Sequence, residues 1–378
     1  MRYKTILFIT ALIILLLTTK VNANDFEKEI SSSINGEIAY FYNSLPKNVQ
    51  EFLPDDFING NLNLLSSESI SEKKFIELAV SYISLGIKDV LKSFSSVLVL
   101  LIITAIFNTI NSSLNSSGLN YAFSICSALC ISLTVIQICN TLCTNTSKYI
   151  NILCNVMNGF IPLMISLLMM NGNFSSAVMV NGSFILFICL VEGFLIAFMM
   201  PLVKMCLAFG VIKAIGSRLD FSGISKTVKT VFTSVTIFLM SVFMFVMSFK
   251  SSLAQSADTL SLKTARFAIS SFVPIVGSSI NDTLRTVSFS LSMLKKSCGM
   301  IAIALVAVLM LPILINLLLN KFSFSLLASI SKLTNGNCES SILDEADSVC
   351  GFLLTIVACT CVLFIFALTI FIKCGGNS

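Results

Sequence analysis

The sequence predicts an all-α polytopic membrane protein. Of its 378 residues, 56% are hydrophobic and only 11% are charged, with a mean hydropathy of +0.93. Soluble globular domains carry about 25% charged residues. Apolar runs of about 20 residues recur along the chain, which is the length that crosses a bilayer as a helix. These observations together exclude the soluble fold classes.

Residues 1–23 have the pattern of a secretory signal peptide. Arg2 and Lys4 precede an apolar core over 6–17, and small residues at the end of "VNA" favour cleavage between Ala23 and Asn24. An uncleaved signal anchor is the alternative interpretation. In both cases the segment that follows is expected to be exported.

The exported segment is expected to comprise residues 24–92. It holds 11 acidic and 6 basic residues, a net charge of −5, and Pro46 and Pro54 divide its first half into short pieces. The stretch "SEKKFIELAVSYISLGIKDVLKSF" reads as an amphipathic helix with Ser71 as its N-cap, and it leads into the first span. The segment is predicted to form either a small helical ectodomain or a spacer.

The multi-spanning membrane domain is predicted over 93–378, where 15 basic and 8 acidic residues give a net charge of +7. Basic residues in such a protein indicate cytoplasmic loops rather than nucleic-acid binding. The stretches 174–216 and 267–292 are ambiguous, so seven or nine crossings fit. The distribution of charge favours nine crossings, with "CESSILDEAD" as an acidic loop on the outer side of the membrane. Seven crossings and nine crossings both place the C-terminus in the cytoplasm. Clear spans are predicted at 94–114, 119–142, 150–171, 228–249, 299–320 and 350–372.

Four prolines suggest a two-fold internal repeat. Pro162 and Pro201 are 39 residues apart, and Pro274 and Pro312 are 38 apart, in similar local sequences. The repeats would cover about 94–216 and 228–372, and interrupted spans at matching positions are typical of transporter-like folds.

The stretch "FVPIVGSSINDTLRTV" (272–287) interrupts an apolar run with proline, glycine and charge. Pro274 kinks a helix and Gly277 permits a turn. Asp282 and Arg285, with Asn281 beside them, share a helix face and can pair. One interpretation is a broken helix that lines a conduit or gate; the other is an interfacial helix whose charges face lipid headgroups.

Glu192 is the second candidate, because a carboxylate within "FICLVEGFLIAF" is costly unless it is protonated, paired or wet. It would contribute to an ion path, pair with Lys204, or mark a turn between two spans.

Composition argues against an enzyme. The chain has no histidine, which removes the commonest general base and metal ligand. An aspartate-type intramembrane protease needs two membrane aspartates, and only Asp282 comes close. Most of the 13 cysteines lie in apolar runs and are expected to be structural rather than metal ligands. No phosphate-binding loop followed by lysine is present, so we expect no catalytic residue, metal or cofactor.

The stretch 272–314 resembles the C-terminal signature of the stage III sporulation protein AE family. The signal peptide, the "LPKNVQEFLP" segment and the total length are also similar to that family. Ser278 departs from the pattern, since many members have a second glycine there. The matching positions are Phe272, Val273, Pro274, Val276, Gly277, Asp282, Thr283, Leu284, Gly299 and Pro312.

This resemblance implies a non-enzymatic, permease-like component of a mother-cell-to-forespore channel apparatus required for endospore formation and late forespore gene expression. It implies the mother-cell-derived membrane around the forespore as location. The implied partners are the other membrane proteins, the ATPase and the ring proteins of the same operon, and a forespore membrane protein across the intermembrane space. Two alternatives remain: a scaffold that assembles the ring proteins without conducting, and a small-solute or ion transporter.

Overall fold

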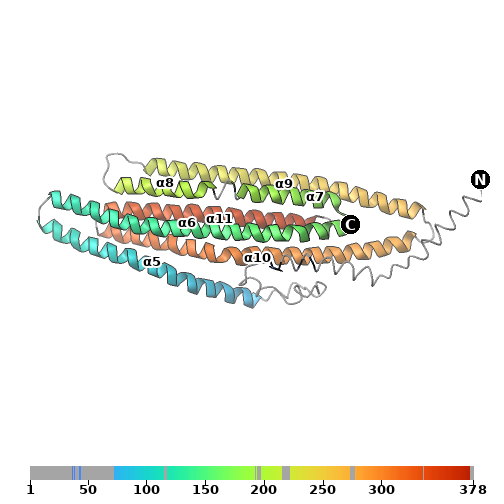
Figure 1. Cartoon of the computed structure of the whole chain (residues 1–378), viewed down its shortest axis with the longest axis horizontal. Helices are drawn as coiled ribbons and strands as arrows, with labels where there is room; N and C mark the ends of the chain where they lie inside the picture. Colours follow the sequence, from blue (N-terminus) through green and yellow to red (C-terminus); the bar gives the residue numbers. More distant parts are fainter. Residues whose placement is uncertain are drawn as a thin grey trace, which may run out of the picture.

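The protein is an elongated bundle of long helices that run nearly parallel or antiparallel to one another (Figure 1). The computed structural model describes residues 36, 38, 42, 43, 72–114, 117–191, 193, 197–214, 222–272, 277–334 and 336–374, and not every side chain within them. The predicted signal peptide and most of the exported segment therefore lie outside the described residues. The helices are α5 (Glu72–Leu114), α6 (Ser117–Met170), α7 (Phe174–Leu190), α8 (Ala197–Ala214), α9 (Ser222–Phe272), α10 (Gly277–Leu333) and α11 (Asn337–Lys373).

The all-helical membrane architecture is confirmed, but one pair of predicted spans is not. Within the described residues, five helices are long and apolar enough to cross a membrane, and α7 and α8 are shorter apolar helices. The expected separate spans at 119–142 and 150–171 both belong to the single helix α6, so that expectation is wrong. The polar residues between them do not end the helix, because Cys143, Thr146 and Ile150 lie on one helix face and are buried in the core. The hydroxyls of Thr144 and Thr146 are satisfied by the carbonyls of Asn140 and Leu142.

The stretch 174–216 does not form the hairpin that nine crossings would need. Helices α7 and α8 follow one another in line along the bundle (Figure 1). The stretch 267–292 holds the end of α9 and the start of α10, where the chain reverses direction. Of the four repeat prolines, Pro162, Pro201 and Pro312 lie inside helices, and Pro274 falls between α9 and α10, outside the described residues.

The turn from α6 to α7 is tied to α9 by a buried aspartate. Gly172 has a φ of +76°, a conformation that glycine adopts without strain. Asp258 of α9 is 3% exposed, and its two carboxylate oxygens accept the backbone N–H groups of Ser175 and Ser176 at 2.8 Å each. These are orphan donors of the first turn of α7, so Asp258 both caps α7 and aligns it with α9.

Replacing Asp258 by alanine is therefore expected to lower the free energy of unfolding by about 1–2 kcal/mol, the usual effect of losing a helix cap. Thermal unfolding of the detergent-solubilised protein, followed by circular dichroism, measures it. The control is Ser256→Ala on the exposed face of α9, whose hydroxyl bonds only to the carbonyl of Ser252. Equal melting temperatures for the two variants would contradict the capping role.

The apolar parts of α9, α10 and α11 lie side by side at the same height along the bundle, and we name this layer the apolar level. The apolar part of α11, residues 351–372, is about 33 Å long at 1.5 Å per residue, which matches the hydrocarbon core. At one end of this apolar level, α9 meets the end of α11, because Ser251 Oγ lies 3.4 Å from Cys374 Sγ. The same end carries a lysine edge, made of Lys250, Lys295, Lys296 and Lys373. At the other end lie the charged residues described next.

Candidate functional site

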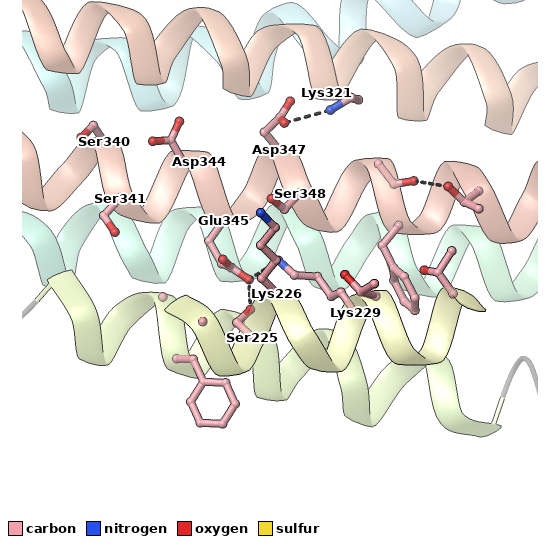
Figure 2. A pocket seen from close by; sticks show the side chains of 18 of the residues that line it. Ser225, Lys226, Lys229, Lys321, Ser340, Ser341, Asp344, Glu345, Asp347 and Ser348 are labelled. Atoms are coloured by element: carbon pink, nitrogen blue, oxygen red, sulfur yellow. Dashed lines mark hydrogen bonds and ion pairs between the residues drawn. The ribbon is translucent and has the colours of Figure 1, made fainter. Parts of the chain in front are cut away.

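A polar groove of about 860 Å³ runs between α9 and α11, with contributions from α8 and α10 (Figure 2). Its lining is rich in hydroxyl groups and carries charges of both signs, although every helix that lines it is an apolar helix. Phe352 and Thr355 mark its extent along α11 towards the apolar level. The polar side chains that define the groove are Ser225, Lys226, Lys229, Lys321, Ser340, Ser341, Asp344, Glu345, Asp347 and Ser348.

Glu345 is the centre of the groove. It forms an ion pair with Lys229 of α9, and Ser225 one turn earlier donates a hydrogen bond to the same carboxylate oxygen. The two charged side chains are only 13% and 14% exposed, so the pair is largely withdrawn from solvent. Gly210 of α8 lies against Glu345; a Cβ at that position would be 2.9 Å from the Glu345 Cγ. Glycine thus lets α8 approach the carboxylate closely.

Two further ion pairs join α10 and α11 beside the groove. Lys321 Nζ lies 2.8 Å from Asp347, and Lys332 Nζ lies 2.8 Å from Asp344. Both pairs are more exposed than the Lys229–Glu345 pair, so their contribution to stability is small. Among the described residues no ion pair joins Lys226, whose exposed ammonium remains available to a ligand of the groove.

The acidic residues belong to a helix, not to the outer loop that was expected for "CESSILDEAD". That expectation is wrong because the stretch has a buried apolar face at helical spacing, with Ile342, Leu343, Ala346 and Val349 at most 5% exposed. This periodicity was the available signal for the helix. Glu339 in its first turn is stabilised by the helix dipole and accepts a 2.7 Å hydrogen bond from Ser127 of α6.

None of the residues selected from the sequence that the structure describes lies at the groove. Glu192 lies between α7 and α8, and its placement is outside the described residues, as are those of Ala23 and Asn24. Gly277 is the first residue of α10, and Pro312 lies inside that helix. The side chains of Asn281, Asp282 and Arg285, in the first turns of α10, are not described. The groove residues Lys229 and Glu345 were not selected.

Gly299 is the selected residue with the clearest structural role. It is buried where α10 crosses α11, and a Cβ there would lie 2.8 Å from the Cδ1 of Ile372 and closer still to its Cγ1. The position therefore holds glycine because the two helices touch. Gly299 therefore allows α10 and α11 to pack closely near the lysine edge.

Gly299→Val is expected to destabilise the protein by about 1–3 kcal/mol, the usual cost of overpacking a core. Gly182→Val in α7 is the matched control, because nothing lies within 4 Å of its Cβ position. The melting temperatures of both variants in detergent test this. A Gly299→Val protein as stable as Gly182→Val would show that α10 and α11 do not meet there.

Comparison with known proteins gives the family. The sequence model of stage III sporulation protein AE matches residues 48–375, most of the chain. This protein belongs to the stage III sporulation protein AE family. A relative named stage III sporulation protein AE, from Bacillus subtilis (strain 168), is 22% identical over 359 residues, covering 93% of this chain and 88% of the relative. No solved structure matches the chain.

Membership in the stage III sporulation protein AE family confirms the resemblance seen in the sequence. It implies a role in sporulation and association with the stage III sporulation A complex. The match extends over α5 to α11, so the polar groove lies within the family's shared region.

Proposed function

We propose that this protein is a non-enzymatic membrane component of the mother-cell-to-forespore channel apparatus, and that its polar groove is part of an aqueous path. The observation that carries the proposal is the largely withdrawn Lys229–Glu345 ion pair in a hydroxyl-lined groove of a membrane bundle. Ionisable residues within membrane segments are costly and typically mark pathways for solutes or ions.

The distribution of lysines supports an orientation. The lysine edge gathers Lys250 of α9, Lys295 and Lys296 of α10, and Lys373 of α11 at one end of the apolar level. At the groove end, lysines are balanced by acidic residues. Since excess lysine favours the cytoplasmic side, the C-terminus would be cytoplasmic and the groove would open to the intermembrane space. Successive helices alternate in direction, with α7 and α8 in line as one pass, so α5 begins on the side where α11 ends (Figure 1). This orientation would therefore replace the expectation that an exported segment leads directly into the first span. The membrane is then the mother-cell-derived membrane around the forespore.

The chemistry available to the chain supports a passive role. A chain without histidine has few options for general base or metal catalysis, and it carries no phosphate-binding loop of its own. The energy for transport would come from the ATPase of the same apparatus. The ring proteins and the forespore membrane protein would continue the path across the intermembrane space.

Blocking the groove tests this proposal against the scaffold alternative. Ser348→Trp would fill the groove with an indole, and Ser329→Trp on the exposed face of α10 is the matched control. Each variant replaces the native chain in a spore-forming host. Late forespore gene expression and heat-resistant spores are counted, and retention of the operon's membrane and ring proteins is measured by co-purification.

A conduit predicts that Ser348→Trp stops forespore development while the partners still co-purify. Normal spores from Ser348→Trp, or loss of spores only together with loss of the partners, would favour a scaffold. Ser329→Trp is expected to behave like the native chain in both measurements.

A further inference from the structure

A second group of polar side chains lies buried at the lysine edge. Ser251 and Gln255 of α9 face Cys374 at the end of α11; the Gln255 Nε2 donates to Ser251 Oγ at 3.0 Å and lies 3.7 Å from the Cys374 Sγ. Lys295 of α10 is within electrostatic range of Cys374 and is fully buried. We name Ser251, Gln255, Lys295 and Cys374 the buried polar cluster.

Lys295 is the unusual member of this cluster. Its side chain is 0% exposed, and within the part of the chain that the structure describes its Nζ has no hydrogen-bond partner. An ammonium group buried without a partner is among the costliest arrangements in a protein. In the rest of the cluster the Gln255 Nε2 donates to the Ser251 Oγ, while the Ser251 hydroxyl and the Cys374 thiol each have one hydrogen to donate. A buried cation beside such donors suits an anion.

Aromatic side chains separate the buried polar cluster from the polar groove. Phe187 of α7 packs between α9 and α11, with its ring centroid 5.1 Å from that of Phe243 and 4.6 Å from that of Phe364. Phe187 and Phe364 are fully buried. We name Phe187, Phe243 and Phe364 the aromatic triad. Nearer the groove, Phe352 packs edge-to-face on Phe232 at 5.3 Å.

The three features follow the same order on two parallel helices. Along α9 they are Lys229, Phe243 and Ser251; along α11 they are Glu345, Phe364 and Cys374. From Glu345 to Cys374 the distance along α11 is about 44 Å at 1.5 Å per residue, enough to cross the hydrocarbon core. The seam between α9 and α11 thus has polar groups at both ends and a dry aromatic barrier between them.

We infer that this seam is a gated path for small inorganic anions, closed by the aromatic triad and selected by Lys295. The inference rests on the proposed function and adds to it a gate and a class of solute. Apolar constrictions close channels by excluding water, so widening the triad should wet the seam. Lys295 would favour an anion over a cation because its ammonium has no hydrogen-bond partner among the described residues.

Chloride entry into liposomes that contain the purified full-length protein tests the inference. A chloride-sensitive dye enclosed in the liposomes reports entry, and a potassium-sensitive dye reports cations. Phe187→Ala is expected to raise chloride entry several-fold over the native chain, with little change for potassium. Phe245→Ala on the same helix as Phe243 is the control, since that side chain is 72% exposed and outside the triad. Adding Lys295→Met to Phe187→Ala is expected to abolish the gain.

Phe243→Ser is a second opening variant, used if Phe187→Ala fails to give a monodisperse helical protein. The inference would be overturned if every opening variant that folds gave the same chloride entry as Phe245→Ala. Failure of both opening variants to fold would overturn it too. A gain that is equal for potassium, or that survives Lys295→Met, would overturn it as well. The liposome measurement is independent of the Ser348→Trp sporulation test. If the opening variants admit no chloride but Ser348→Trp still blocks sporulation, the anion path is refuted and the proposed function stands.

Discussion

Glu345→Ala is expected to destabilise the protein by about 2–3 kcal/mol, below the ~3–5 kcal/mol for breaking a fully buried ion pair, because the pair is partly exposed to the groove. The reason is that Lys229, with a side chain 13% exposed, would keep its charge in the groove wall without compensation. Ser225 would lose its acceptor at the same time. A loss of this size is a large part of the stability of a typical domain. Thermal and denaturant unfolding in detergent measure it.

Asp344→Ala is the matched control for Glu345→Ala, one position earlier on the same helix. Its carboxylate is 52% exposed and pairs with an exposed Lys332, so the expected loss is about 0–1 kcal/mol. If both variants lost the same stability, the central role of Glu345 would be refuted. The double variant Lys229→Met, Glu345→Leu removes both charges and is expected to recover most of the stability. It should nevertheless fail to support forespore development, because the groove would lose its central pair of charges.

Lys295→Met is expected to have the opposite effect on stability. It keeps the length of the buried stem and removes an ammonium that has no partner among the described residues. The gain should be about 2 kcal/mol or more, because the effective penalty of burying an ion is several kcal/mol. A higher melting temperature together with impaired forespore development would indicate that Lys295 is retained for function at the expense of stability.

The matched control for Lys295→Met is Lys296→Met. Lys296 is the next residue on α10 and is exposed, so its replacement should leave the melting temperature nearly unchanged. A Lys295→Met protein less stable than Lys296→Met would mean that the lysine is compensated in the native protein. The cost assigned here to its burial would then be wrong.

The fold class and the family were accessible from the sequence because they depend on regional properties. Low charge and apolar runs predict a helical membrane protein whatever the packing, and the stretch 272–314 carried the family's signature. The division into spans was less accessible. Hydropathy falls over 144–148, and this dip separated two predicted spans. Helix α6 nevertheless continues through it, because Cys143, Thr146 and Ile150 are buried on one face.

The groove was missed because it depends on which helices lie together. Lys229 and Glu345 are 116 residues apart. Lys229 lies at the start of the predicted span 228–249, whereas Glu345 was expected in an acidic outer loop. The residues that were selected, Asp282 and Arg285, lie in the first three turns of α10, and Asp282 is about 20 Å along the helix axis from Lys295. A charged residue in an apolar stretch can be recognised from the sequence. Whether it lines a groove, as Lys229 and Glu345 do, or lies near the end of a helix depends on how α9 packs on α11, which the sequence does not show.

Thiol accessibility along one face of α11 tests most directly the claim that the groove is aqueous. Ser341, Ser348, Thr355 and Val362 follow one another at intervals of seven, and the first three line the groove or adjoin it. Single cysteines would be placed at these positions in a version that lacks the 13 native cysteines. A small membrane-impermeant thiol reagent would be applied to sporulating cells with the intermembrane space opened. We predict labelling at 341, 348 and 355 and none at 362, where the side chain faces the apolar level. Labelling that is absent at 348 and 355 would contradict a water-filled groove, and the scaffold role would then explain the protein better.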